Sequence, residues 1–444
     1  MELVIENLGK VHSARIALNG VTVITGPNGS GKSTISRGLF TWLTYLRQLD
    51  REEVYECAGN VVDAVNDLLK DQDIPHLSLS LAKSRHAERL LDPNFWRDQQ
   101  AVVKLIVENA GMHATVFADL AVLERSIESY YPAIRDCALS RLDRKDDTLD
   151  AFLLERHFRR AFDRQFGTLG VDDCVTLIRT ISDIGRTRSC LFRDGLVSEL
   201  TDVHGNHVQR AFYVEPRHLV DEFGGRQVPN GIYRRMNNRY TVDSDYGWER
   251  VLNTPSFESE LLFSQAEKRK AINAELDVIV SMLHGEFDTG DRALVFKDRD
   301  IRGDNEVSLM NVASGAKSMA MIVRGMRNGT IAPGDMLIID EPESNLHPEW
   351  QVAFAKFLVL INAKFDVRVL LNTHSPYFLK AVLVHSDRLE RSQYCSYYNM
   401  VRAADGVTYD ADPVTDRVEE VFKAMSAPYA QLVYGDNYGR HIPR

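Results

Sequence analysis

The pattern of apolar and polar residues changes twice along the chain. Short runs rich in β-branched residues predict strands at residues 2–8 and 15–25. From about residue 34 to 165, apolar residues recur every three or four positions, which indicates mostly helical structure. Strand patterns return at about 189–203 and 211–215. The chain therefore begins as β structure, passes through a helical region and returns to β structure.

The C-terminal half alternates between helices and strands. The predicted elements are a helical stretch, two short strands, and then helix, strand, helix, strand and helix: 257–284, 292–300, 306–312, 315–327, 336–339, 349–362, 367–372 and 376–384. A strand at 394–401 and a helix at 417–433 follow. Alternation of this kind is typical of a parallel sheet covered by helices.

These patterns predict an α/β fold with a large helical insertion. Residues 1–40 and 166–444 are expected to form one domain whose two halves are distant in sequence. Residues 41–165 are expected to form the insertion between them.

Composition narrows the class of protein. The chain has 444 residues, of which 44% are hydrophobic and 26% charged, as in a globular protein. No apolar run approaches the roughly 20 residues of a membrane helix, and the N-terminus does not resemble a signal peptide. The five cysteines are far apart, which favours a reducing compartment, so we expect a cytoplasmic protein. The net charge of −10 means that any nucleic-acid binding needs a local basic face, and the short basic clusters are interleaved with acids.

The sequence GPNGSGKST predicts a phosphate-binding loop. It matches G-x-x-x-x-G-K-[ST] in full, after the apolar run VTVIT and before a helical pattern. Backbone N–H groups of such a loop surround an anion, the lysine reaches the outer phosphates, and the serine hydroxyl binds Mg²⁺. The alternative is a glycine-rich turn before a helix without a ligand. The expected binding residues are Gly26, Pro27, Asn28, Gly29, Ser30, Gly31, Lys32, Ser33 and Thr34.

An acidic pair follows the apolar run 336–339. Asp340 is expected near the Mg²⁺ that Ser33 also binds, and Glu341 is expected to polarise the attacking water as general base. Four apolar residues before Asp-Glu are common at strand ends. Together with a complete phosphate loop, they predict a hydrolytic site.

A histidine follows the next apolar strand. His374 could hydrogen-bond a γ-phosphate or stabilise the charge that develops there, whereas the alternative is a structural histidine at a strand end. His347 is expected to pack or cap near the loop 343–348 instead.

The sequence ASGAKS precedes the helix predicted at 315–327. By itself, Ser314 could be the N-cap of an ordinary buried helix. Lys317 could equally be an exposed helical lysine or a positive charge at an interface.

The segments GPNGSGKST, ASGAKS, IIDEPESNLHP and LNTHSP, in this order, resemble the ABC-type ATPases of the SMC, RecF and OLD branch. The resemblance covers about 1–40 and 190–444, and implies a P-loop ABC-ATPase sheet sandwich that uses ATP and Mg²⁺. It places Ser314 and Gly315 at the signature motif, with Ala316 where the family has a second glycine, and Lys317 beside them. In such ATPases two subunits pair head to tail around ATP.

Several functions fit this branch. An OLD-type nuclease module would need more than the roughly 60 residues that follow THSPYFL, and a repair ATPase would have long coiled-coil arms or a basic channel. The chain is more similar to the stand-alone ATPases of two-gene anti-phage systems, of the AriA type of PARIS or the PtuA type of Septu. That resemblance implies a homo-oligomer built on ATP-bridged dimers, such as a hexamer of dimers. It also implies a separately encoded nuclease of Toprim or HNH type, a phage-encoded trigger and no membrane partner. The alternative is an SMC/RecF-like DNA-repair ATPase that binds DNA directly.

Overall fold

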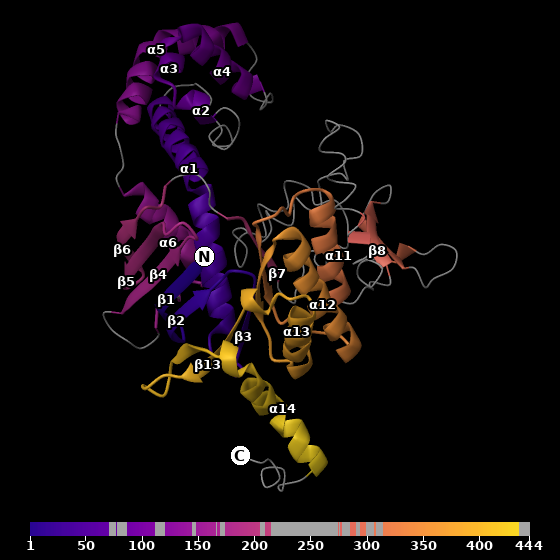
Figure 1. Cartoon of the computed structure of the whole chain (residues 1–444). Helices are drawn as coiled ribbons and strands as arrows, with labels where there is room; N and C mark the ends of the chain where they lie inside the picture. Colours follow the sequence, from indigo (N-terminus) through magenta and orange to yellow (C-terminus); the bar gives the residue numbers. More distant parts are fainter. Residues whose placement is uncertain are drawn as a thin grey trace. The chain divides into compact units, whose positions relative to one another are not determined.

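The computed structural model describes two compact units of the chain (Figure 1). Residues 1–47 and 155–444 form the core unit, and residues 48–154 form the helical unit. Helix α1 (Lys32–Leu69) supplies residues to both. In the part of the chain that is described, no helix is both long and apolar enough to cross a membrane. The described residues are 1–70, 77, 87–111, 120–143, 148–165, 167–168, 174–204, 209–214, 274, 276–277, 285–289, 294–298, 306–307 and 314–434.

Five neighbouring strands of the core unit run parallel to one another. In spatial order they are β7 (Ala211–Val214), β11 (Met336–Asp340), β12 (Arg368–Asn372), β3 (Val21–Thr25) and β13 (Cys395–Arg402). The register places Asp340 opposite Asn372, and Asn372 opposite Ile24. Because parallel strands end at the same edge of a sheet, the residues that follow β3, β11 and β12 meet there.

Helices cover both faces of these parallel strands. On one face, alternate strand residues such as Val23 and Ile339 join a single buried cluster with four helices. On the other face α1 packs, since Phe40 stacks on Tyr213 with ring centroids 5.5 Å apart. Burial on both sides explains why the strands are continuous apolar runs. The four helices are α11 (Ser314–Arg327), α12 (Pro348–Phe365), α13 (Pro376–Arg388) and α14 (Val418–Tyr434).

The rest of the 11-stranded sheet is mostly antiparallel. β14 pairs antiparallel with β13 and parallel with β2, which joins the two parts of the sheet. Helix α6 (Leu149–Ala161) contributes Phe158, whose ring lies 4.9 Å from that of Phe192. The strands of this part are β1 (Glu2–Leu8), β2 (Val11–Ala17), β4 (Val175–Ile181), β5 (Thr187–Arg193), β6 (Leu196–Thr201) and β14 (Tyr409–Pro413).

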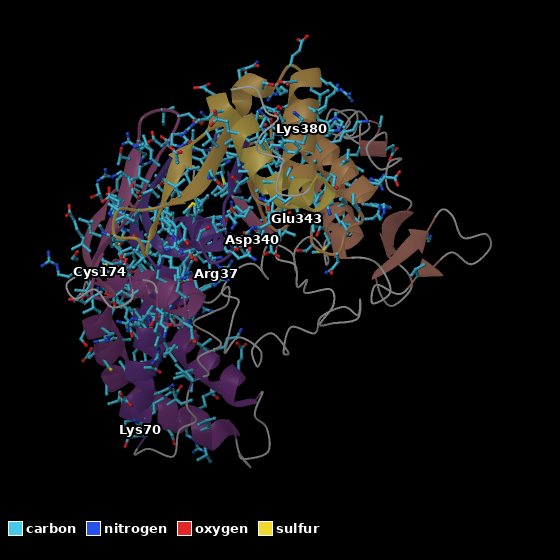
Figure 2. All side chains as sticks on the ribbon, turned by 90° about the horizontal axis from the view of Figure 1, so that it is seen from below. Arg37, Lys70, Cys174, Asp340, Glu343 and Lys380 are labelled. Atoms are coloured by element: carbon cyan, nitrogen blue, oxygen red, sulfur yellow. The ribbon has the colours of Figure 1, made fainter. Side chains whose placement is uncertain are left out.

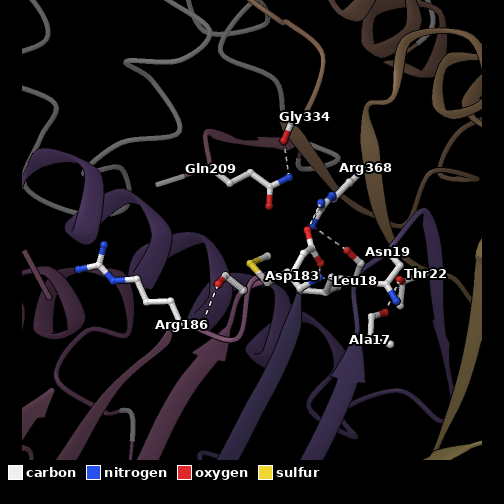
Figure 3. Close-up of polar contacts among 11 residues, drawn as sticks. Ala17, Leu18, Asn19, Thr22, Asp183, Arg186, Gln209, Gly334 and Arg368 are labelled. Atoms are coloured by element: carbon white, nitrogen blue, oxygen red, sulfur yellow. Dashed lines mark hydrogen bonds and ion pairs between the residues drawn. The ribbon is translucent and has the colours of Figure 1, made fainter. Parts of the chain in front are cut away.

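Polar side chains form hydrogen bonds at the edge of the sheet where β7, β11 and β12 begin, opposite the edge where they end (Figure 3). Arg368, the first residue of β12, donates to the Asp183 carboxylate at 2.6 Å and to the Leu18 carbonyl at 3.3 Å. Gln209, just before β7, donates to the carbonyl of Gly334 just before β11. These contacts hold the starts of strands whose opposite ends carry the predicted site residues.

The helical unit has a hydrophobic core of its own. Trp96 is fully buried and donates from its indole nitrogen to the Leu90 carbonyl at 2.7 Å, and Tyr131 donates to the Trp96 carbonyl at 3.0 Å. Both aromatic residues therefore bury a large ring while satisfying its polar atom. Besides the second part of α1, the helices are α2 (Ala87–Leu90), α3 (Pro93–Arg97), α4 (Gln99–Gly111) and α5 (Leu120–Leu142).

The structure confirms a mixed α/β fold with a large sheet, and it corrects two strand predictions. The segment 15–25 is not one strand, because the chain turns between β2 and β3 at Gly20. A Cβ atom at Gly20 would lie 2.3 Å from the Tyr394 carbonyl oxygen, so only glycine permits this close approach. The segment 189–203 is a hairpin of β5 and β6, which turns at Asp194 and Gly195, with φ of 51° and 77°. β4 and β14 had not been predicted.

A separate three-stranded antiparallel sheet contains part of the region between β7 and α11. Its strands are β8 (Gly285–Thr289), β9 (Leu294–Asp298) and β10 (Glu306–Val307). Most of the predicted helical stretch 257–284 lies outside the described residues, as do 308–312. The division of the chain into domains 1–40, 41–165 and 166–444 stays a prediction.

Candidate nucleotide-binding site

The phosphate-loop sequence connects β3 to α1. Gly26, Gly29 and Gly31 have φ of 136°, 70° and 95°, a backbone region that side chains other than glycine rarely adopt. A Cβ atom at Gly26 would lie 2.7 Å from Cβ of Met400, and one at Gly31 would lie 2.8 Å from Cγ2 of Val11. Glycine is therefore required twice over at these positions, by backbone conformation and by space.

Lys32 folds back over this loop. Its Nζ donates to the carbonyl oxygens of Gly26 at 3.0 Å and Pro27 at 2.9 Å, and the residue is 5% exposed. Burial lowers the pKa of Lys32 to about 8, although the carboxylates of the site, Asp340 first, oppose this change. The ammonium group is thus poorly solvated and held by weak neutral acceptors, so an anion in the loop would be a much stronger partner.

Ser30 supplies a direct test of whether the loop suits a phosphate. Its hydroxyl oxygen is buried and has no hydrogen-bond partner among the described residues. A buried polar atom without a partner is costly unless a ligand or water satisfies it. Together with the glycine conformations, this hydroxyl fits a loop that binds phosphate oxygens.

Asp340 lies at the end of β11 and is 7% exposed. Its carboxylate accepts hydrogen bonds from Tyr213 Oη at 2.5 Å and from Asn372 Nδ2, and the Ser33 hydroxyl lies near it. Burial raises the pKa of Asp340, and these three groups, Tyr213 first, oppose the rise. Arg37 of α1 opposes it more weakly through its charge (Figure 2).

The same group of atoms suits a magnesium ion. The Ser33 hydroxyl is near enough to the Asp340 carboxylate to lower the pKa of that carboxylate, and both groups offer the hard oxygen ligands that Mg²⁺ prefers. The Asn372 amide oxygen is buried and has no partner in the described part of the chain. Asn372 Nδ2 already donates to the Asp340 carboxylate and, at 2.8 Å, to Ser36 Oγ, so the amide oxygen is the polar atom of this side chain that is left for a ligand or water.

Glu341 is exposed and has a left-handed backbone, with φ of 48°. Its N–H donates to the Asn372 carbonyl at 2.9 Å, and its carboxylate accepts from Ser344 Oγ at 3.0 Å. A non-glycine residue in this conformation is uncommon and costs energy, which the surrounding structure must hold. The Glu341 side chain is exposed, so a water molecule can reach its carboxylate.

His374 lies beyond the end of β12 and is half-buried. Burial first, and the charge of Lys32 second, lower its pKa, whereas a hydrogen bond to the Gly26 carbonyl and the charge of Glu341 raise it. His374 thus lies beside the Gly26 carbonyl to which Lys32 Nζ donates. The structure brings these two residues together with Asp340 and Glu341 around the phosphate loop.

The predicted signature residues lie at the start of α11. Ser314, Gly315 and Lys317 belong to its first turn, but their side chains lie outside the described residues. From residue 318 onward the helix is largely buried, including Met319 and Ile322. The prediction that this turn faces a nucleotide stays open. His347 is the N-cap of α12, where its Nδ1 accepts from Glu349 N at 3.4 Å, which confirms the expected structural role.

Three residues of the site were missed in the sequence. They are Tyr213 and Asn372, which hold Asp340, and Glu343, whose carboxylate accepts from Thr373 and from the His374 backbone. Asn372 could have been found as the last residue of a strand that ends beside the acidic pair. The segment AFYVE gave no sign that Tyr213 lies next to β11.

Two family models match the chain. One, described as "AAA domain, putative AbiEii toxin, Type IV TA system", matches residues 230–380, and the other, described as "AAA domain", matches residues 2–114. The first includes the acidic pair and His374, and the second includes the phosphate loop. Both sides of the site thus match AAA-type domains, which supports an ATPase and indicates a nucleotide-hydrolysing enzyme.

Other comparisons add little. No curated protein matches the chain in sequence. Among solved structures, the SMC head domain from Thermotoga maritima has a TM-score of 0.37 at 12% identity, covering 93% of this chain and 98% of that one. The SMC head bound to the C-terminal winged-helix domain of ScpA has a TM-score of 0.37 at 12% identity, with 93% and 97% covered. An ATP-binding cassette of an ABC transporter, in its ADP conformation, has a TM-score of 0.32 at 10% identity, with 98% of both chains covered. Scores of this size carry no conclusion about this chain.

Proposed function

We propose that this chain is an ABC-type ATPase subunit that binds ATP and Mg²⁺ at the candidate site and hydrolyses ATP to ADP and phosphate. The observation that carries this proposal is that Ser33 of the phosphate loop lies beside Asp340 at the end of β11, whose partner Asn372 also donates to Ser36 of the same helix as Ser33. Ser33 and Asp340 are 307 positions apart in the sequence (340 − 33). They meet only because β3, β12 and β11 end at one edge of the sheet.

Each residue then has a separate task. The loop 26–34 holds phosphate oxygens through its N–H groups, and Lys32 moves from the loop carbonyls to the outer phosphates. Ser33 and Asp340 hold Mg²⁺, which neutralises phosphate charge when bound. Glu341 accepts a proton from the attacking water, and His374 donates to the γ-phosphate.

The site is proposed to be completed by a second copy of the chain. In the head-to-tail pairing that the motif resemblance implies, the first turn of α11, with Ser314, Gly315 and Lys317, faces the γ-phosphate held by the partner. A helix N-terminus suits this task because its free N–H groups attract an anion. ATP would then join two protomers, and hydrolysis would release them. Such dimers are proposed to assemble further, for example into a hexamer of dimers.

The cellular role is proposed to be anti-phage defence. The four motifs and their order resemble the stand-alone ATPases of two-gene defence systems. The family model over 230–380 carries a description that names a putative AbiEii toxin of a type IV toxin–antitoxin system, that is, a system of a toxin and a separate antitoxin. The ATPase would hold a separately encoded Toprim-type or HNH nuclease and release or activate it when a phage component appears.

The assembly state tests the pairing directly. Glu341→Gln should bind ATP without hydrolysing it, so size exclusion with light scattering should show a shift to dimers or multiples of dimers when ATP is added. Lys32→Ala is the matched control and should show a shift only at about 10- to 100-fold higher ATP, because it should bind the nucleotide more weakly. An unchanged mass of Glu341→Gln with saturating ATP would contradict the ATP-bridged dimer.

A further inference from the structure

Glu343 is a carboxylate of the site to which neither the motifs nor the proposed chemistry assign a task. It lies three residues beyond the end of β11 (343 − 340), in the loop that follows Glu341. Its Oε2 accepts from Thr373 Oγ1 at 2.9 Å, and its Oε1 accepts from the backbone N–H of His374 at 2.6 Å. One carboxylate therefore accepts hydrogen bonds from two consecutive residues that follow β12. Figure 2 labels Glu343 together with Asp340.

The loop that carries Glu343 is braced internally as well. Ser344 N donates to the Glu341 carbonyl at 2.9 Å, and Leu346 N donates to the Glu343 carbonyl at 3.1 Å. The Ser344 hydroxyl also holds the Glu341 carboxylate, at 3.0 Å. The position of Glu341 is thus fixed relative to Glu343, and Glu343 in turn is fixed to His374.

Keeping the Glu343 carboxylate ionised at this position costs free energy. Burial raises the pKa of Glu343, and the nearby charge of Glu341 raises it further, whereas the His374 N–H first, then the N–H of Glu343 itself and the Thr373 hydroxyl, lower it. Within the described residues no lysine or arginine forms a salt bridge with it. A purely structural contact between two loops could be made by a neutral side chain at lower cost. Ionisable groups whose pKa is shifted by burial and by a neighbouring charge are concentrated at functional sites.

We propose that Glu343 is a positioning residue that holds the His374 backbone at a fixed place relative to Glu341. The general base Glu341 and His374, which donates a hydrogen bond to the γ-phosphate, would then keep a constant position relative to each other. This inference rests on the proposed function. Glu343 would not touch the nucleotide, so its loss should slow turnover without weakening nucleotide binding. Binding depends on the loop 26–34, to which Glu343 makes no hydrogen bond among the described residues. Its charge acts on Lys32 of that loop, after the charges of Asp340 and Glu341.

Steady-state ATP hydrolysis and nucleotide affinity, measured side by side, separate this role from a structural one. We expect Glu343→Ala to lower kcat by about 10- to 100-fold, with the affinity for ATP unchanged within about 2-fold. Glu343→Gln should fall between wild type and alanine, because its amide oxygen can still accept one of the two hydrogen bonds. Glu349→Ala, an exposed glutamate in the first turn of α12, is the matched control and should match wild type.

A second measurement needs no enzymatic activity. Hydrogen–deuterium exchange of the peptide covering 373–375 should be about 10-fold faster in Glu343→Ala, because the His374 amide loses its acceptor. Unchanged exchange there, or a parallel loss of binding and turnover, would overturn the inference. If wild type hydrolyses no ATP while the exchange of 373–375 behaves as expected, Glu343 does hold the His374 backbone, and it is the proposed ATPase function that is contradicted.

Discussion

The two sides of the candidate site are built in different ways. The phosphate loop is nine consecutive residues, 26–34, whose shape is determined by three left-handed glycines. The acidic side is assembled from the ends of three strands, where Tyr213 of β7, Asp340 of β11 and Asn372 of β12 form one hydrogen-bonded group. The first side is local and mostly backbone. The second depends on the register of strands that are far apart in sequence.

This difference suggests a division of tasks. Backbone N–H groups and Lys32 suit binding of the nucleotide, whereas the carboxylates, held in place by neighbouring strands, suit the chemical step. Substitutions on the loop side should therefore change affinity, and those on the acidic side should change kcat or metal dependence. The four predictions below test this division, beginning with the largest expected effect.

Glu341→Gln should lower kcat by about 10²- to 10⁴-fold, because the general base is lost while the size of the side chain is kept. ATP affinity should stay within a few-fold of wild type. Phosphate release under saturating ATP and Mg²⁺ measures kcat, and binding of a fluorescent ATP analogue measures the affinity. Glu349→Gln is the control. Equal turnover in Glu341→Gln and wild type would remove Glu341 as the base.

Lys32→Ala should weaken ATP binding by about 10- to 100-fold, since a charge-assisted contact to phosphate is lost. The same fluorescent analogue measures this change. Lys104→Ala, on an exposed face of α4, removes a lysine of the helical unit and should leave affinity unchanged. Full affinity in Lys32→Ala with impaired turnover would mean that the loop side does not bind through this residue.

Tyr213→Phe should raise the Mg²⁺ concentration needed for half-maximal hydrolysis by about 10-fold, because the Asp340 carboxylate loses one of the donors that orient it. Titration of activity with Mg²⁺ at fixed ATP measures this. Tyr131→Phe is the matched control, since it removes another buried tyrosine hydroxyl, one that donates to the Trp96 carbonyl in the helical unit. An equal shift in both variants would point to a general loss of stability instead.

Nucleotide affinity should decline at alkaline pH. The pKa of free Lys32 is lowered to about 8, and contact with phosphate would raise it, so binding above that pH requires uptake of a proton. Affinity should thus be complete below about pH 8 and fall several-fold by pH 9. Lys32→Arg, whose guanidinium stays protonated, should bind more weakly but without this decline. A wild-type affinity that does not change between pH 7 and 9 would contradict the role of Lys32.

The same contrast shows what could be predicted from the sequence. The loop 26–34 is recognisable because its chemistry is contiguous, and Asp340 because a buried apolar run precedes it. Tyr213 could not be predicted, because it acts on Asp340 only through the parallel register that pairs it with Ile338 of β11. Glu343 was missed for the same reason, since its partners follow a different strand.

Strand boundaries were predicted less well than the presence of strands. The turn between β2 and β3 falls on Asn19-Gly20, a dipeptide typical of turns, so a local signal was present inside the apolar run. The close approach of Gly20 to the Tyr394 carbonyl, 374 positions away in sequence (394 − 20), has no local signal. β14 was not predicted, although it pairs with both β13 and β2 and so joins the two parts of the sheet. Periodicity therefore identified the helices and the parallel strands of the core unit better than its antiparallel part.

The most direct test of the account is phosphate release by the purified wild-type chain at saturating ATP, with and without Mg²⁺, beside Glu341→Gln. The account predicts Mg²⁺-dependent release by wild type that falls about 10²- to 10⁴-fold in Glu341→Gln, while both proteins bind the nucleotide. Release that does not depend on Mg²⁺, or that is the same in both proteins, would contradict it.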